Sequence, residues 1–394
     1  MDPYKDIRPY HDEEIRPVLD SLLTDRDFIR SIASFSYPTL FRWLPSLLTV
    51  FIRRRLTAQL KNVNSVKSIQ DVIAGYMDQM IERTTSRLTN SGLDKLSQEK
   101  SYLFISNHRD IAMDPAFVNY MLYHAGFDTL YIAIGDNLLK RPFVTDLMRL
   151  NKSFIVKRSL KGRELLKSSK QLSEYIHHCI EINRNVWIAQ REGRAKDGVD
   201  RTDTALLKML GMSRRPETLA DALRSLHIVP VSISYEFDPC DTFKGEELHQ
   251  KQLSGSYQKG EQSDINSIVA GMVGFKGRVH VAFGDELALE SGIDDEAIAA
   301  EIDRQVIANY LLQQTNLLAL KQLQELSPDS VPLLSDEGQH VLAGLQPDSA
   351  TVTQFNERMA AMSPAVQHYV RLMYANPAIS RYADRRKHVE PGRS

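Results

Sequence analysis

The stretch YLFISNHRDIAMDP, residues 102–115, joins a short apolar run to a cluster of polar side chains. Its first five residues have the length and composition of a buried β-strand. The cluster that follows contains His108, Asp110 and Asp114. In open α/β sheets, ligands bind beyond the carboxyl ends of the strands, so this cluster is a candidate functional site.

Similar apolar runs recur along the chain after residue 100, and stretches with helical periodicity separate most of them. The runs lie at residues 130–134, 153–156, 186–189, 228–235 and 278–283. This alternation predicts an α/β fold with a mixed, largely parallel sheet flanked by helices. Helical patterns dominate on both sides of this part of the chain. We therefore expect a helical N-terminal region over 1–95, a central α/β domain over 96–292 and a helical C-terminal region over 293–394.

Composition narrows the classes of protein to consider. The 394 residues carry a net charge of −1, with 42% hydrophobic and 25% charged residues, which is typical of a globular protein. No excess of positive charge attracts nucleic acid, so no such partner is expected. The two cysteines, Cys179 and Cys240, do not form a disulfide framework and suit a reducing compartment. The N-terminal residues lack the apolar core of a signal peptide.

One segment of the N-terminal region, residues 37–56, combines apolar and basic residues. An apolar run over 43–52 ends in three arginines, 53–55. The run is about half the roughly 20 residues that a membrane span requires. We expect an amphipathic helix at a membrane surface, with the arginines near anionic lipid and three aromatic side chains at the headgroups: Phe41, Trp43 and Phe51. The alternative is a helix packed on the core with a solvated basic end.

Two interpretations of the opening stretch, a protein kinase and a two-metal phosphoesterase, do not agree with the order of motifs along the chain. His108-Arg109-Asp110 spells the HRD of protein kinases, but that motif requires an Asn where this chain has Pro115, and no Gly-rich ATP loop precedes it. A two-metal phosphoesterase would place its Gly-Asp loop before its Asn-His loop, whereas the GDN of residues 135–137 comes later. We therefore expect no metal.

Proton abstraction by His108 is the third possibility. Histidine is the most frequent general base, and a carboxylate that binds its other ring nitrogen fixes the tautomer. Asp114 or Asp110 could supply that carboxylate.

Basic residues follow two of the later predicted strands. The sequence SFIVKRSLKG (153–162) contains Lys157, Arg158 and Lys161, which suit a phosphate or carboxylate ligand. The sequence REGRAKDG (191–198) places a glycine among charged residues, where the backbone can approach a ligand closely; its candidates are Arg191, Glu192, Gly193 and Arg194. The next run, IVPVSISYE (228–236), contains Pro230, which predicts an edge strand or a bulge.

Taken in this order, the four blocks resemble the glycerolipid acyltransferase superfamily. NHRDIAMDP is similar to its His-x4-Asp block, and SFIVKRSLKG to the second block of the bacterial glycerol-3-phosphate acyltransferases. REGRAKDG resembles the Glu-Gly-x-Arg block, and IVPVSISYE the apolar block with a central proline. The resemblance spans roughly residues 95–285 and implies a glycerol-3-phosphate acyltransferase-like fold for the α/β domain.

The chain departs from the family pattern in two places. Five residues separate His108 from Asp114 instead of four, which leaves Asp110 as the alternative carboxylate. Gly193 and Arg194 are adjacent, whereas the family has one residue between them, so either Arg191 or Glu192 occupies the position of the family's Glu.

The resemblance implies an enzyme of phospholipid biosynthesis. His108, oriented by Asp114, would take a proton from the hydroxyl of glycerol-3-phosphate or of lysophosphatidate (1-acylglycerol-3-phosphate). That oxygen would attack the thioester of acyl-CoA or acyl-carrier protein, with no cofactor or metal. The basic residues of the second and third blocks would hold the acceptor phosphate. The enzyme would be cytoplasmic and peripheral on the inner face of the cell membrane. A non-catalytic lipid-binding module, or an acyltransferase for another lyso-lipid, is the alternative.

Overall fold

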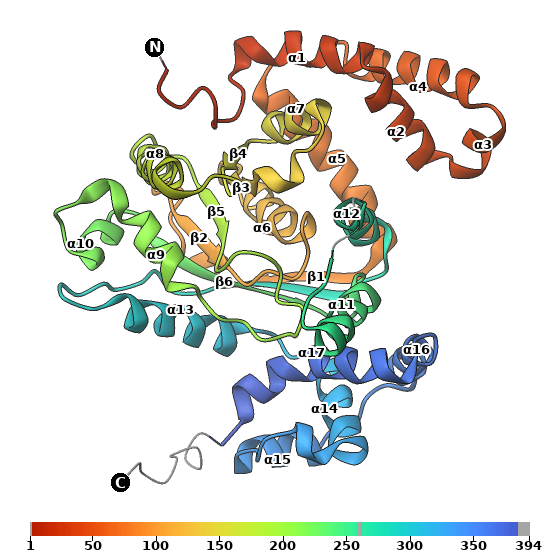
Figure 1. The fold of residues 1–394 in the computed structure, drawn as a ribbon, viewed down its shortest axis with the longest axis vertical. Helices are drawn as coiled ribbons and strands as arrows, with labels where there is room; N and C mark the ends of the chain where they lie inside the picture. The colour runs from red at the N-terminus through yellow and green to blue at the C-terminus, as the bar shows by residue number, and fades with distance from the viewer. Residues whose placement is uncertain (1, 259, 261, 385–394) are drawn as a thin grey trace.

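The computed structural model describes residues 2–258, 260 and 262–384, and it is built around one sheet of seven strands (Figure 1). The strand order across the sheet is β1-β7-β6-β2-β5-β3-β4. The strands are β1 (Thr85–Ser91), β2 (Leu103–Ser106), β3 (Tyr131–Gly135), β4 (Ser153–Val156), β5 (Val186–Ala189), β6 (Ile228–Tyr235) and β7 (Gly277–Phe283). All neighbouring pairs are parallel except β6 and β7. The predicted mixed, largely parallel sheet is confirmed.

The six predicted strands are present, and β1 is the additional one. Its sequence, TSRLTNS, is mostly polar, and it begins immediately after helix α5 (Val66–Thr84), with no Gly or Pro between them. The periodicity of α5 therefore hides the start of the strand. β1 pairs with β7 at the edge of the sheet, where its polar side chains reach solvent.

The expectation that Pro230 marks an edge strand or a bulge is wrong. β6 is fully buried and lies between β2 and β7. Pro230 is tolerated because the ladder between β6 and β7 begins one residue later, with the pair Val231 and Phe283. The carbonyl of Pro230 accepts a hydrogen bond from the Gly284 N–H at 2.8 Å.

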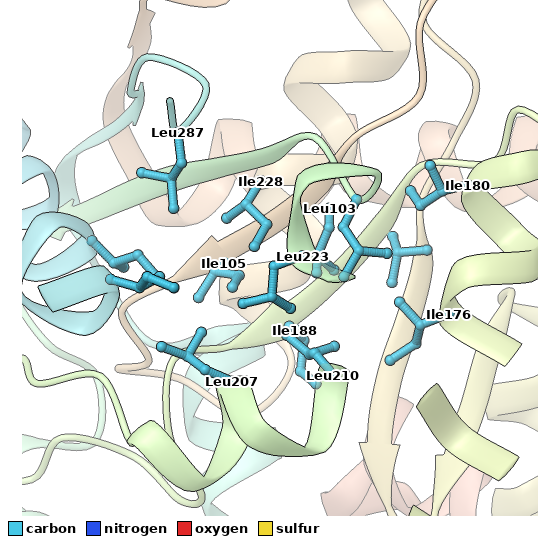
Figure 2. Packing of buried hydrophobic residues seen from close by; sticks show 14 of the residues in the cluster. Leu103, Ile105, Ile176, Ile180, Ile188, Leu207, Leu210, Leu223, Ile228 and Leu287 are labelled. Carbon is cyan, nitrogen blue, oxygen red and sulfur yellow. The ribbon is translucent and has the colours of Figure 1, made fainter. Parts of the chain in front are cut away.

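Helices cover both faces of the sheet, and each face has its own hydrophobic core. One core lies between the sheet and helices α8 (Gly162–Glu181), α9 (Thr204–Leu210), α10 (Leu219–Arg224) and α13 (Asp295–Asn309). Figure 2 shows its leucines and isoleucines packed between strands and helices. The opposite core includes side chains of α5 and of α6 (Met113–His124). Because the sheet is buried on both faces, its central strands are mostly apolar, and the serines that they contain, Ser106, Ser232 and Ser234, are buried.

The terminal helices lie at opposite ends of the molecule (Figure 1). The N-terminal group comprises α1 (Asp12–Thr24), α2 (Arg26–Ser36), α3 (Pro38–Trp43) and α4 (Pro45–Gln59), and α7 (Pro142–Leu150) packs against α1. The C-terminal group comprises α14 (Gln314–Leu326), α15 (Asp336–Ala343), α16 (Ser349–Ala360) and α17 (Pro364–Tyr382). Helix α11 (Asp241–Ser254) packs on α17, and α12 (Ser263–Val273) lies beside α5.

Helices α3 and α4 expose apolar side chains on one side, here called the α3–α4 apolar face: Leu40, Trp43, Leu44, Leu47, Val50 and Phe51. Trp43 is 80% exposed, while Leu48 and Ile52 of α4 are buried in the N-terminal helical cluster. Phe41 is half-buried under the Arg30 guanidinium. No helix in the described part of the chain is both long and apolar enough to cross a bilayer.

Candidate active site

A histidine and a carboxylate meet where β2 ends and α6 begins. Nδ1 of His108 lies 2.9 Å from Oδ2 of Asp114. Asp114 stands in the first turn of α6 and is fully buried, whereas 14% of the His108 side chain is exposed. The same carboxylate oxygen accepts the backbone N–H groups of Arg109 and Asp110. The loop therefore wraps around the carboxylate and orients the imidazole, with Nε2 as the ring nitrogen left for a substrate.

Asp110 makes different contacts. Its Oδ1 accepts the backbone N–H groups of Ala112 and Met113 at 3.0 and 2.9 Å, at the start of α6. Burial, followed by the nearby charge of Asp114, raises its pKa. The extra residue between His108 and Asp114 thus belongs to a loop that the hydrogen bonds of Asp110 stabilise. Asp114, and not Asp110, contacts the histidine ring.

Two aromatic residues that the sequence did not single out complete this arrangement. The Tyr235 hydroxyl donates to Oδ1 of Asp114 at 2.6 Å, and burial raises its pKa well above the ordinary value. The Trp187 ring packs edge-on to the His108 ring, with centroids 5.8 Å apart. Tyr235 lies inside the IVPVSISYE block, so its place at the carboxyl end of a strand was a usable signal.

An apolar cavity of about 330 Å³, here called the β3 cavity, opens beside His108. It extends along β3 from Ile132 to Gly135 and reaches Thr129, two residues before the strand, a path of roughly 20 Å at about 3.3 Å per residue. Side chains of α5, α6, α7 and α12 form much of the rest of its wall. A long apolar group could therefore lie along β3 with its reactive end at the histidine.

Two predicted basic residues, Arg158 and Arg194, line the same cavity as His108. The guanidinium of Arg158 lies 3.6 Å from the Glu192 carboxylate, and its backbone N–H donates to Asp136 at 3.1 Å. Gly193 also lines the cavity, with a φ of +75° and open space where a Cβ would stand. These groups bring positive charge and accessible backbone to one end of an otherwise apolar space.

Within the part of the chain that the structure describes, the guanidinium group of Arg194 has a hydrogen-bond partner for only one of its two terminal nitrogens. Its Nη2 donates to the Ser267 hydroxyl at 3.2 Å, whereas Nη1 is buried and has no hydrogen-bond partner among the described residues. A buried guanidinium N–H without a partner is costly, so an acceptor atom from a ligand would suit this position.

The structure does not bring the remaining predicted residues to the cavity. The Lys157 amine pairs with Asp6, and Lys161 is exposed immediately before α8. Arg191 lies 3.7 Å from Asp197, and Glu192 is 72% exposed in its pair with Arg158. None of these four described residues, Lys157, Lys161, Arg191 and Glu192, lines the β3 cavity.

Buried polar contacts fix the loop of residues 191–200 against the histidine loop. Ala195 N–H donates to the His108 carbonyl at 2.7 Å. The Arg109 guanidinium forms a buried ion pair with Asp200 at 2.6 Å, and the Asn107 amide also donates to that carboxylate. The sequence showed Arg109 only as part of a polar cluster, so this supporting role had to come from the structure.

No group of His, Cys, Asp and Glu side chains within the described ranges has an arrangement that could hold a metal ion. The carboxylates around His108 are engaged by N–H and O–H donors of the protein itself.

Comparison with known proteins adds family information to this geometry. Residues 87–234 match the family model described as Acyltransferase. A glycerol-3-phosphate acyltransferase of Pseudomonas paraeruginosa (strain DSM 24068 / PA7) is 27% identical over 301 residues, covering 74% of this chain and 31% of the relative. Another, from Pseudoalteromonas translucida (strain TAC 125), is 28% identical over 251 residues, covering 59% of this chain and 29% of the relative.

Among solved structures, the 1-acyl-sn-glycerophosphate (LPA) acyltransferase of Thermotoga maritima matches with a TM-score of 0.39 and 12% identity, covering 71% of this chain and 93% of that one. The chain spans less than a third of the length of the two curated relatives. The matched region, residues 87–234, contains the His108 loop and the loop of residues 191–200. Through this region the chain is similar to the Acyltransferase family and to the glycerol-3-phosphate acyltransferases named above.

Proposed function

We propose that this protein is an O-acyltransferase that transfers a fatty acyl group to the hydroxyl of glycerol-3-phosphate or 1-acylglycerol-3-phosphate. The observation that carries the proposal is the His108–Asp114 pair at one end of an apolar cavity that Arg158 and Arg194 also line. The relatives named above as glycerol-3-phosphate acyltransferases support this acceptor class.

The geometry suits general-base catalysis. With Nδ1–H directed to Asp114, Nε2 of His108 takes the proton of the acceptor hydroxyl while its oxygen attacks the thioester carbonyl. The tetrahedral intermediate then collapses, the carbon–sulfur bond breaks, and the imidazolium returns the proton to the departing thiolate. Asp114 stabilises the transient imidazolium, and no covalent enzyme intermediate forms.

The apolar and the charged parts of the substrates bind in different parts of the cavity. The acyl chain lies along β3, where burial of each CH₂ contributes about 0.8 kcal/mol. The acceptor phosphate lies against Arg158 and Arg194, whose guanidinium groups suit a phosphate. Acyl-CoA or acyl-carrier protein is the donor, as a co-substrate, and the reaction uses no resident cofactor or metal.

The α3–α4 apolar face gives the enzyme access to its lipid substrates. Its Trp43 and Phe51 side chains enter the headgroup region, and Arg53, Arg54 and Arg55 lie on exposed positions of the same helix as Phe51. This arrangement supports peripheral attachment to the inner, cytoplasmic face of the cell membrane.

Thiol release from palmitoyl-CoA tests the function. Purified protein and the His108→Ala variant are compared with glycerol-3-phosphate, with lysophosphatidate and with no acceptor. Acceptor-dependent release should fall about 10²- to 10⁴-fold in the variant, because a general base contributes about that much. The assay is repeated with acyl-carrier protein as donor. No acceptor-dependent release with either donor would contradict the proposal and favour a non-catalytic lipid-binding module.

A further inference from the structure

A second cavity, here called the α11–α12 cavity, lies on the other side of helix α12. It has a volume of about 600 Å³. Asp264, Ile268 and Met272 of α12 line the β3 cavity, at a spacing of four residues. The first turns of the same helix present polar side chains to the α11–α12 cavity: Ser263, Asn266 and Ser267. Helix α12 therefore separates an apolar space from a polar one.

Arg194 lines both cavities. Its bond to Ser267 holds the guanidinium against the first turns of α12, and its buried Nη1 has no partner among the described residues. A phosphate bound by Arg194 would thus lie where the two cavities meet. Any group attached to the far side of that phosphate would extend into the α11–α12 cavity.

Some charged side chains that line the α11–α12 cavity form ion pairs within the protein, and others do not. Lys244 is buried in an ion pair with Asp238, and Glu247 accepts the amines of Lys196 and Lys251. Glu246 is exposed to the cavity and has no ion-pair partner within the described part of the chain. Among the described residues that line this cavity, one cation, Arg194, and one anion, Glu246, therefore remain to interact with a ligand.

Two aromatic side chains, Phe243 and Tyr257, line the same cavity. Aromatic faces attract ammonium groups, and a carboxylate beside them strengthens that preference. A free phosphate monoester such as glycerol-3-phosphate would engage Arg194 and leave Glu246 and the aromatic pair without a role. A ligand with a phosphate and an ammonium group would engage both charges.

We propose that the α11–α12 cavity receives an ammonium-bearing headgroup, so that the enzyme also acylates lysophospholipids whose phosphate is a diester, such as lysophosphatidylethanolamine. This inference rests on the proposed acyl transfer at His108. The phosphate lies on Arg194, the ammonium group lies between Glu246 and the aromatic side chains, and the glycerol hydroxyl remains on the His108 side of α12.

Acyl transfer from palmitoyl-CoA to three acceptors tests the inference: lysophosphatidate, lysophosphatidylethanolamine and lysophosphatidylglycerol, which has the same diester without the ammonium group. The measured quantity is the ratio of kcat/KM for the ethanolamine and glycerol headgroups. We expect a ratio of about ten in the wild type, because a charge-assisted contact contributes at least that factor. Glu246→Gln should bring it close to one. Glu325→Gln, an exposed change on α14, should leave it unchanged.

Each result separates this inference from the proposed function. A wild-type ratio near one, or a ratio that Glu246→Gln does not change, would overturn the headgroup assignment. Acylation of lysophosphatidate alone would also overturn it, while the proposed function would stand. No acyl transfer to any of the three acceptors from either donor would overturn the proposed function, and this inference with it.

Discussion

The Tyr235 hydroxyl lies 2.6 Å from Oδ1 of Asp114, while the His108 ring binds the other oxygen of the same carboxylate. Both oxygens of a fully buried aspartate are thus held, one by a phenol and one by the imidazole and two backbone N–H groups. The orientation of His108 therefore depends on a strand, β6, that contributes no atom to the histidine loop.

Tyr235→Phe should remove only the hydroxyl and leave Oδ1 of Asp114 buried without its donor. We expect a loss of about 1–3 kcal/mol in the free energy of unfolding. Asp114 then orients the His108 ring less firmly, so kcat should fall while KM for the acceptor changes little. Tyr102→Phe is the control, because its buried hydroxyl accepts the Ser97 N–H away from the site. Steady-state kinetics measure both constants, and an equal fall of kcat in both variants would contradict the assignment.

Asp114→Asn and Asp110→Asn should differ sharply in activity. Asn at 114 lacks the charge that stabilises the imidazolium. Its amide NH₂ group would also lie against the N–H and O–H donors that now bind the carboxylate. We therefore expect kcat to fall about 100-fold or more. Asn at 110 accepts the same backbone N–H groups about as well as Asp, and a neutral group suits a position where burial raises the pKa of the acid. Steady-state kinetics of both folded variants decide between them, and equal losses would refute the pairing described here.

Arg158→Ala should raise KM for a phosphate-bearing acceptor about tenfold and change kcat little, since a charge-assisted contact to the phosphate is lost. Lys157→Ala is the matched control: this neighbouring cation pairs with Asp6 and does not line the β3 cavity. Acceptor KM is measured for both at saturating palmitoyl-CoA. If Lys157→Ala raised KM as much as Arg158→Ala, the phosphate would have to lie elsewhere.

Replacing Trp43 and Phe51 by Ser should weaken binding to vesicles that contain anionic phospholipid, by about tenfold or more. Sedimentation with vesicles measures the change. Leu326→Ser with Leu333→Ser is the control pair, because both leucines are similarly exposed in the C-terminal region. Equal binding by both double variants would show that the α3–α4 apolar face does not dock, and a collapsed melting transition in the first would favour a packing role.

Lys276 should make stability depend on alkaline pH. Burial lowers the pKa of its amine to about 8, although it donates to the Thr84 hydroxyl and the Gly274 carbonyl. As pH falls from about 10.5 to 8, the unfolded chain binds this proton and the native protein does not, so the native state loses stability. The wild type should therefore gain up to about 3 kcal/mol relative to Lys276→Met between pH 7 and 10. Denaturant unfolding at both values measures this, and parallel behaviour of the two proteins would contradict it.

Strands with a strong local sequence pattern could be predicted, whereas a strand with a weak pattern was missed. Apolar runs bounded by polar clusters marked six strands, whereas β1 is polar, lies at an edge and continues directly from α5. The position of Pro230 depends on where pairing with β7 begins, and pairing between strands cannot be read from either strand alone.

The same contrast holds within the candidate site. Motif order indicated His108, Arg158 and Arg194, which the structure brings to one cavity, and it left Asp114 and Asp110 as alternatives for the carboxylate. It could not separate Lys157 from Arg158, because the difference between them is an ion pair with Asp6, about 150 positions away in the chain. The place of Tyr235 at the end of a strand could be read from the sequence, but its contact with Asp114 of α6 could not, because no local pattern links the two elements.

The hydrogen bond from Ala195 N–H to the His108 carbonyl has a consequence for regiochemistry. It joins the two loops through main-chain atoms, one residue from Arg194, so the main chain restrains the distance between the Cα atoms of His108 and Arg194. An acceptor whose hydroxyl lies too near to its phosphate, or too far from it, can reach only one of the two. In the proposed acyl transfer, the contact between these two loops would therefore select which acceptor hydroxyl becomes an ester.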